Sequence, residues 1–367
     1  MPEPGDGVTP RPRSGTYLLP IKRSAAPASA ELAAYLAWVA ARMPVIVVDG
    51  SPAAVFAAHA AAWGDVVRHV PVAPDLVVPN GKVAGVLTGL RYVAGEAVII
   101  ADDDVRYDDA SLAAVLRALD GADVVRPQNY FAPHPWHAVW DTGRILLNRA
   151  TGGDWPGTLA VRRAALQATH GYAGDVLFEN LELVRTIVAA GGRERVASSV
   201  FVRRLPTTTR HFWSQRVRQA YDELARPRRL ATQLAILPAA ALLLRVGRLP
   251  EAAAAAAAML IAAAEWGRRR DGGRRVFPAA GSVMAPLWVA ERAVTAWLAV
   301  ATRVLRGGVS YAGTRIARAA TPMRELRRRH AGAITSTSIG LNVPLFDSSA
   351  EHAVTPTTRS ISARSSR

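Results

Sequence analysis

The sequence contains no cysteine, and this absence excludes several kinds of site. Without thiols the 367-residue chain cannot form disulfide bonds, bind zinc through thiolates or use a cysteine nucleophile. Lysine is nearly absent as well, since only Lys22 and Lys82 occur among 45 basic residues. The first 15 residues are rich in proline and glycine and lack the apolar stretch of a signal peptide, so we expect a cytoplasmic catalytic domain.

No uninterrupted apolar run reaches the roughly 20 residues that a membrane-spanning helix needs. Three shorter uncharged runs occupy 230–244, 252–264 and 276–290. Such lengths suit a buried helical core, whereas the arginine clusters that bracket the runs favour a hairpin with both ends at the cytoplasmic face of the cell membrane. Trp288 and Trp297 are typical of an interfacial helix. Both interpretations stay open at this point.

Acidic residues are scarce in one half of the chain only. Residues 201–330 hold 24 arginines and seven acidic residues, a net charge of +17, while the rest has 21 basic and 22 acidic residues. A near-neutral half followed by a basic, Ala/Leu-rich half predicts an enzyme domain that docks on an anionic membrane surface. Nucleic acid is not expected, because the aromatic residues of the basic half lie beside apolar runs instead of forming a stacking surface.

Strand-like and helix-like segments alternate in the N-terminal half. Short β-type runs at 16–20, 44–48, 66–72 and 97–101 alternate with helical patterns at 30–42, 55–63, 81–93 and 110–119. This spacing predicts βαβ units and a mostly parallel sheet, which binds ligands at the carboxyl ends of its strands. Further on we predict an irregular aromatic segment at 124–157 that forms a lid or an acceptor wall, a helix at 177–190, a strand at 200–205 and a basic helix at 209–224.

Three consecutive carboxylates end the apolar run 97–101. On an extended chain Asp102 and Asp104 point to the same side, about 7 Å apart. Oxygen-only ligands at that separation suit a hydrated Mg²⁺ or Mn²⁺ that also holds a diphosphate. Asp49 ends the strand 44–48, so we expect it to belong to the same site.

Six short motifs follow one another in a recognisable order. They are DGS at 49–51, NGKV at 80–83, DDD at 102–104, GTLAVRR at 157–163, FENLEL at 178–183 and QRVRQ at 215–219. Together they make residues 16–221 resemble a family 2 glycosyltransferase of the GT-A fold, most similar to the membrane-associated ceramide glucosyltransferase branch. The resemblance implies inverting transfer of a sugar from a nucleotide-diphosphate sugar to a hydroxyl of a lipid-linked or other hydrophobic acceptor.

The resemblance also implies roles for the donor site. Asp49 corresponds to an aspartate that binds the base or ribose, and Lys82 to a lysine near the nucleotide. Gly157 begins the small-residue turn beneath the donor sugar. The triad at 102–104 corresponds to the DXD motif: Asp104 and Asp102 are the expected metal ligands, and Asp102 and Asp103 also belong to the expected donor-binding set.

Two motifs depart from the family pattern. Where the family has Glu-Asp with the aspartate as general base, this chain has Glu179-Asn180, and an amide cannot accept the proton. We therefore expect Glu179 to be the base, with Asp175 and Asp154 as alternatives; an inactive enzyme is the other possibility. In the QRVRQ motif a glutamine replaces the family's tryptophan, but Gln215 and Arg218 share a helical face and are predicted to meet the diphosphate.

The expected organisation has five parts. A disordered N-terminus (1–14) precedes a GT-A domain (15–228), hydrophobic membrane-associated helices (229–306), a basic amphipathic segment (307–330) and a disordered tail (331–367). Two other functions remain open. One is a catalytically inactive transferase fold that binds membrane or nucleotide. The other is a nucleotidyltransferase, although residues 20–24 offer basic side chains without the glycine-rich loop such enzymes carry.

Overall fold

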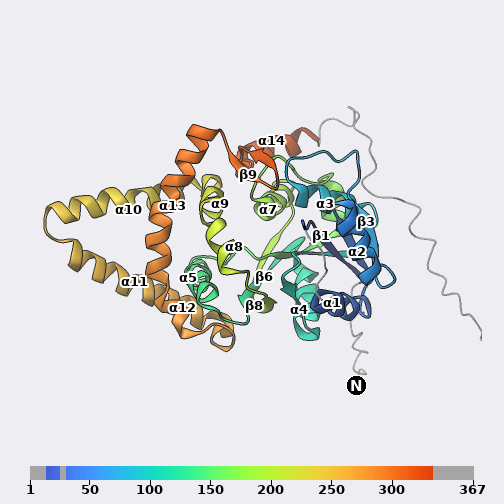
Figure 1. The fold of residues 1–367 in the computed structure, drawn as a ribbon, viewed down its shortest axis with the longest axis horizontal. Coiled ribbons are helices and arrows are strands. Elements are labelled where there is room, and N and C mark those ends of the chain that lie inside the picture. The colour runs from blue at the N-terminus through green and yellow to red at the C-terminus, as the bar shows by residue number, and fades with distance from the viewer. Residues whose placement is uncertain (1–13, 25–29, 334–367) are drawn as a thin grey trace, which may run out of the picture.

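The computed structural model describes residues 14–24 and 30–333, and these residues form a mixed α/β domain followed by a group of helices (Figure 1). The predicted disordered tail lies outside the described residues except for 331–333, as does the N-terminal segment except for residue 14. In the described part of the chain one sheet has eight strands, in the order β3-β2-β1-β4-β7-β6-β8-β5.

The N-terminal half of the sheet is parallel, as the alternating pattern predicts. Its strands are β1 (Gly15–Ile21), β2 (Val45–Asp49), β3 (Arg68–Pro71) and β4 (Ala97–Ala101), with α1 (Ala30–Ala40), α2 (Ala53–Trp63) and α3 (Gly81–Leu90) between them. The short β5 (Val105–Arg106) and α4 (Asp109–Ala118) follow. Because the strands run in parallel, the ends of β1, β2 and β4 meet at one edge of the sheet.

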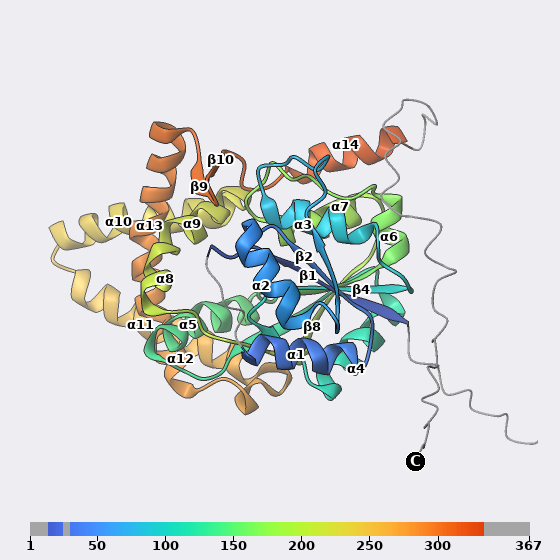
Figure 2. The ribbon, with the colours of Figure 1, turned by 45° about the vertical axis from the view of Figure 1, so that its right-hand side comes forward.

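Helices cover both faces of the sheet, which explains the continuous apolar strands. One core packs Leu32 and Leu36 of α1 and Val115 of α4 against the β-strands. The opposite core packs Val86 of α3 with Leu183 and Ile187 of α7 (Glu179–Ala189). Figure 2 shows α1 and α4 on one side of the sheet and α3, α6 (Arg163–Ala168) and α7 on the other.

The prediction that residues 124–157 are irregular is wrong, although side chains of this region line the cleft described below. This region forms β6 (Val124–Phe131), α5 (Trp136–Ala150) and a loop into β7 (Thr158–Arg162). The strand escapes prediction because its polar side chains Gln128 and Asn129 are buried and hydrogen-bonded, so the apolar pattern is lost. The helix α5 begins directly after Pro135, where a missing N–H costs nothing.

The sheet continues with antiparallel pairs. β7 pairs antiparallel with both β4 and β6, and β8 (Glu194–Arg204) pairs parallel with β6 and antiparallel with β5. β8 begins six residues before the strand predicted at 200–205. Pairing with β5 places Arg204, the last residue of β8, opposite Val105 and so beside the triple aspartate.

The C-terminal helices extend the molecule on one side. The basic helix predicted at 209–224 is divided at Gln215 into α8 (Thr209–Ser214) and α9 (Arg216–Tyr221). The next helices are α10 (Pro227–Arg245), α11 (Leu249–Arg269), α12 (Ala279–Val283) and α13 (Ala285–Arg306). In Figure 1 α10 and α11 form an arm that projects from the body, and α13 passes across its base.

The projecting arm is apolar and exposed. Leu242, Leu244 and Met259 are each more than 60% exposed. Within the described ranges one segment, Leu249–Arg275, is long and apolar enough to cross a membrane, and 6% of its most apolar window is buried. The arm nevertheless packs on the body at its base, where Gln233 of α10 and Ala264 and Gly267 of α11 are buried and α11 lies against α5.

A small hairpin follows α13 and turns back toward the sheet. It consists of β9 (Val309–Tyr311) and β10 (Thr314–Ile316), joined by Ala312 and Gly313, both with positive φ. Thr314 donates a hydrogen bond to the carbonyl oxygen of Pro79. The basic helix α14 (Met323–Ala333) comes next. The predicted amphipathic segment thus contains a hairpin whose turn the sequence analysis did not recognise.

Candidate active site

The carboxyl ends of β1, β2 and β4 bring the first predicted motifs together. The backbone N–H of Arg23, just after β1, donates to the hydroxyl of Ser51, just after β2. The guanidinium of Arg23 in turn binds Asp103 at 2.6 Å. These contacts join the DGS motif to the triple aspartate, as the parallel pattern predicts. Asp103 therefore faces Arg23 and has its own partner, separate from those of Asp102 and Asp104.

Asp49 lies at this edge, but its side chain is sealed from solvent. One carboxylate oxygen accepts from the Ser51 backbone N–H at 2.8 Å. The other lies 2.6 Å from His59 Nδ1 and 3.1 Å from His69 Nε2. The carboxylate thereby holds the turn after β2 in place. A direct contact with a nucleotide base would require these partners to be displaced.

Lys82 connects two of the predicted motifs. It occupies the first turn of α3, after the N-cap Asn80. Its Nζ lies 2.5 Å from Asp102 and 2.8 Å from Glu179, so the carboxyl end of β4 and the start of α7 share one cation. Burial opposes this charge, but the two carboxylates outweigh burial and keep the pKa of Lys82 above its ordinary value.

Arg204 is the other cation at the triple aspartate. Its Nε donates to Asp104 at 2.8 Å and its Nη2 to Asp102 at 3.3 Å. Sequence reasoning missed it, because it is one of 43 arginines and lies about 100 positions from its partners. Burial alone would raise the pKa of Asp102, yet the charges of Lys82 and Arg204 lower it, so this carboxylate is ionised.

The two predicted metal ligands suit a hard divalent cation. Asp104 Oδ1 is buried and has no hydrogen-bond partner among the described residues, so it is available as an oxygen ligand. Within residues 14–24 and 30–333 no group of three or more His, Asp or Glu side chains is placed to hold a metal. Two carboxylates are sufficient for Mg²⁺ or Mn²⁺ when substrate phosphates and water complete the shell.

Gly157 leaves no room for a side chain beneath these carboxylates. The Asp102 N–H donates to its carbonyl oxygen, and its own N–H donates to Asn129 Oδ1. A Cβ added at Gly157 would lie 2.6 Å from Asp102 Oδ2 and 3.1 Å from Arg204 Cζ. Close approach to Asp102 therefore explains this glycine, in addition to the role that the family resemblance implies.

The three carboxylates predicted as general base have different surroundings. Glu179 lines the cleft but is paired with Lys82. Asp175 is exposed and lines neither of the two cavities described below. Asp154 is buried and accepts from Arg144 and Asn148, so it fixes the loop before β7 to α5. Asn180 donates to the carbonyl oxygen of Pro156 and is likewise structural.

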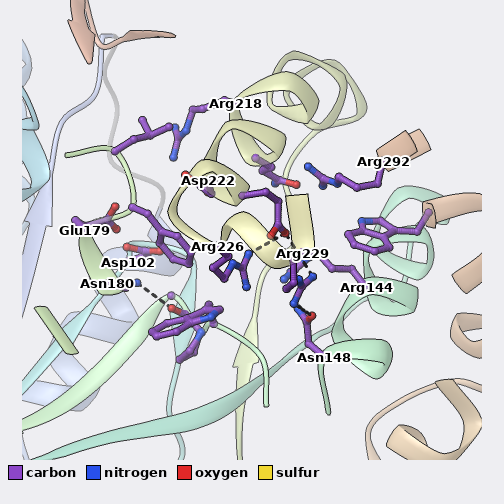
Figure 3. Close-up of a pocket in the computed structure, with 18 of the residues that line it drawn as sticks. Asp102, Arg144, Asn148, Glu179, Asn180, Arg218, Asp222, Arg226, Arg229 and Arg292 are labelled. Atoms are coloured by element: carbon purple, nitrogen blue, oxygen red, sulfur yellow. Dashed lines mark hydrogen bonds and ion pairs between the residues drawn. The ribbon is translucent and has the colours of Figure 1, made fainter. Parts of the chain in front are cut away.

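A fourth carboxylate, missed in the sequence analysis, faces the cleft. Asp222 follows α9 directly, and Figure 3 shows it between Arg218 and Arg226. Its Oδ1 is buried without a hydrogen-bond partner in the part of the chain that the structure describes. Burial raises the pKa of Asp222 to about 7, Arg218 lowers it and Glu179 raises it. Its only sequence signal is its position next to the QRVRQ motif.

Two neighbouring cavities occupy this cleft, with volumes of about 190 and 340 Å³. Asp102, Gly157 and Glu179 line the first, and Asp103, Asp104 and Gln215 line the second. Four residues line both cavities: Arg144, Arg204, Arg218 and Gln219.

The β9–β10 hairpin closes one side of the cleft, because the Arg218 guanidinium lies over the Tyr311 ring at 4.8 Å. Gln215 and Arg218 thus both reach the cleft, although the helix breaks between them.

Comparisons with known proteins were made by family model, sequence and structure. No protein-family model and no curated protein matches the chain. Among solved structures it is similar to the mannosyltransferase PcManGT from Pyrobaculum calidifontis in complex with GDP-Man and Mn²⁺: 20% identity, 78% of this chain and 87% of that one, TM-score 0.44.

Two further similarities are to TarS 1–349 of S. aureus in complex with UDP-GlcNAc and to glucosyl-3-phosphoglycerate synthase of Mycobacterium tuberculosis. The first has 13% identity over 55% of this chain and 61% of that one, with a TM-score of 0.38. The second has 14% identity over 55% and 74%, with a TM-score of 0.36. These neighbours are glycosyltransferases. All three TM-scores lie below 0.5.

Proposed function

We propose that this protein is a metal-dependent, inverting glycosyltransferase that uses a nucleotide-diphosphate sugar and belongs to the membrane-associated part of family 2. The observation that carries the proposal is the cluster at the end of β4. There Asp102 and Asp104 meet Lys82 and Arg204 above a glycine that leaves space for nothing larger. Paired carboxylates and fixed cations at a sheet edge suit a ligand made of a cation and a diphosphate.

The donor would lie along this edge. Asp102 and Asp104 would hold Mg²⁺ or Mn²⁺, which supplies positive charge for the leaving diphosphate. Lys82, Arg204 and Arg218 place further positive charge around the same position, in a cleft where charge interactions are stronger than in water. The ends of β1 and β2 would receive the nucleoside, with Asp49 supporting the turn at Ser51 from behind.

Asp222 is the carboxylate best suited to accept the acceptor proton. Glu179 shares Lys82 with Asp102, so its carboxylate is already held in an ion pair. Asp222 has a free, buried oxygen and a pKa near 7. As the acceptor O–H bond breaks and its proton passes to Asp222, the acceptor oxygen bonds to the anomeric carbon. The bond from that carbon to the diphosphate breaks on the opposite face and leaves its electron pair on the diphosphate.

The hydrophobic helices support a position at the cytoplasmic face of a membrane and a lipid-linked acceptor. The arm formed by α10 and α11 exposes leucine, alanine and methionine side chains. Arg228 and Arg229 lie at one base of the arm and Arg268–Arg270 at the other, so both bases carry charge suited to anionic headgroups. The catalytic cleft lies next to the same base, since Arg229 and Arg292 of α10 and α13 line it.

A nucleotide-sugar panel with Mg²⁺ or Mn²⁺ tests the proposal by release of nucleoside diphosphate and by donor binding. We expect release with one donor, and loss of more than about a hundredfold in Asp104→Ala because one metal ligand disappears. Asp65→Ala, at an exposed position outside the cleft, is the matched control and should match the wild type. If no donor binds, the inactive transferase fold is the correct interpretation instead.

A further inference from the structure

Arg292 is the most unusual charged side chain of the cleft. It projects from α13, is 2% exposed, and ranks among the largest fully buried side chains. Its Nε and Nη1 are buried and lack hydrogen-bond partners in residues 14–24 and 30–333. Burial lowers the pKa of its guanidinium, but arginine keeps its proton in proteins. Its one ring contact is with Trp288, whose centroid lies 5.1 Å from Arg292 Cζ. A buried cation that forms no ion pair in the described residues is costly unless an anion binds beside it.

Three further arginines surround the same end of the first cavity. Arg144 comes from α5, Arg229 from α10 and Arg226 from the residue before α10. Glu223 forms ion pairs with Arg226 at 2.9 Å and with Arg229 at 3.4 Å. Arg144 forms an ion pair with Asp154. Three of these four guanidinium groups thus pair with two carboxylates, whereas Arg292 forms no ion pair in the described residues.

The nearest acid along the chain raises the pKa of Arg292 but forms no ion pair with it in the described residues. Glu291 precedes Arg292 in α13, but its contacts are with Arg216 at 3.4 Å and with Thr295. Arg216 is itself bound by Asp141. An excess of positive charge therefore stays at the Arg292 end of the cavity.

The Arg292 end of the cavity is separate from the end at Asp102, where the nucleotide-sugar donor is proposed to bind; we call the latter the donor end. In Figure 3 Arg292 points into the cavity from the side opposite Asp102 and Glu179, and Asp222 lies between the two ends. A donor diphosphate at Asp102 would leave the Arg292 end vacant, whereas a second substrate could reach Asp222 with one group and Arg292 with another. Resting on the function proposed above, we infer that the acceptor is a hydroxyl-bearing phosphate ester whose phosphate binds Arg292, Arg144 and Arg229.

The phosphate ester can come from a lipid headgroup or from a soluble metabolite, and matched probes separate these sources. Full-length protein in neutral detergent is titrated with phosphatidylglycerol, with uncharged diacylglycerol and with soluble glycerol 3-phosphate. Each titration is done with the preferred nucleoside diphosphate and its metal saturating, so that the donor end is filled. We expect a phosphate-bearing probe to bind more tightly than diacylglycerol. Phosphatidylglycerol alone indicates the lipid source, and glycerol 3-phosphate binding equally well indicates the soluble one.

The variants assign the binding to this site. Arg292→Gln should weaken binding of the phosphate probe about ten- to a hundredfold, the loss expected for charge-assisted hydrogen bonds. Its nucleoside diphosphate affinity should stay unchanged. Arg306→Gln, exposed on the same helix, is the control. Since Arg292 has an incomplete set of partners, its neutralisation should leave the midpoint of thermal unfolding equal or higher; if the variant is lost to misfolding, Arg229→Gln serves as the second variant.

Two outcomes overturn the inference, and they differ from failure of the proposed function. The anion site is refuted if diacylglycerol binds as tightly as the phosphate probes. It is also refuted if Arg292→Gln and Arg229→Gln bind phosphate as tightly as the wild type, even when sugar transfer is observed. Arginine-dependent phosphate binding without transfer from any donor keeps the anion site and refutes the transferase.

Discussion

Substitution of Asp222 by Asn is the sharpest test of the proposed chemistry. With a pKa of about 7, this carboxylate is about one-tenth ionised at pH 6 and about nine-tenths ionised at pH 8. If Asp222 takes the acceptor proton, the turnover rate of the wild type should rise about tenfold between these pH values. Asp222→Asn should lower the rate by about 10² to 10⁴ and abolish this rise, because an amide accepts no proton. Donor affinity should be preserved.

The same group makes a prediction for stability. The folded state holds this proton up to pH 7, whereas an unfolded aspartate loses it near 3.8, so the folded state binds more protons in between. The contribution of Asp222 to stability therefore falls as pH rises from about 4 to about 7, by up to about 4 kcal/mol. Denaturant unfolding at pH 5 and pH 8 should show a smaller difference in Asp222→Asn than in the wild type. The exposed Asp65→Asn should behave like the wild type.

The assays are steady-state transfer with the donor identified by the panel, and equilibrium unfolding. Glu179→Gln is measured in parallel, because Glu179 was the base expected from the sequence. Loss of the pH-dependent rise in Glu179→Gln, with a normal profile in Asp222→Asn, would refute the assignment and restore the earlier one. An unchanged rate in both variants would mean that the base is a different group.

Three further variants test the glycine turn beneath Asp102 and the arm formed by α10 and α11. In Gly157→Ala the added Cβ would meet Asp102 Oδ2 at 2.6 Å, so we expect donor affinity measured by titration to fall at least tenfold. The control Gly121→Ala, with open space around its Cβ position, should be unaffected. Normal donor binding in Gly157→Ala would contradict the close packing. Leu242→Glu and Leu244→Glu on the arm should reduce flotation of the protein with liposomes, since a carboxylate in the apolar layer costs about 2.5 to 3.5 kcal/mol. The control variant Val77→Glu, at an exposed position in a loop outside the arm, should float with liposomes as the wild type does. Equal flotation of all three would mean that the arm does not enter the bilayer.

Local pattern was sufficient for much of the fold. The apolar runs that became β1, β2 and β4, and the helical periods of α1 to α4, depend on neighbours within a few positions, and this information is present in any short window of sequence. The acidic end of β4 predicts the candidate site for the same reason. The pattern failed at β6, where buried Gln128 and Asn129 replace apolar residues, and at the Gln215 break.

The residues that give the site its charge depend on contacts distant in sequence, and only the tertiary structure decided them. Arg204 reaches Asp102 and Asp104 because β8 pairs with β5. Asp49 is closed off because α2 and β3 bring two histidines to it. Asp222 and Arg292 look like ordinary surface charges in a basic sequence. Burial sets them apart, because removing a charge from water changes its proton affinity and its need for a partner, and burial belongs to the packed chain.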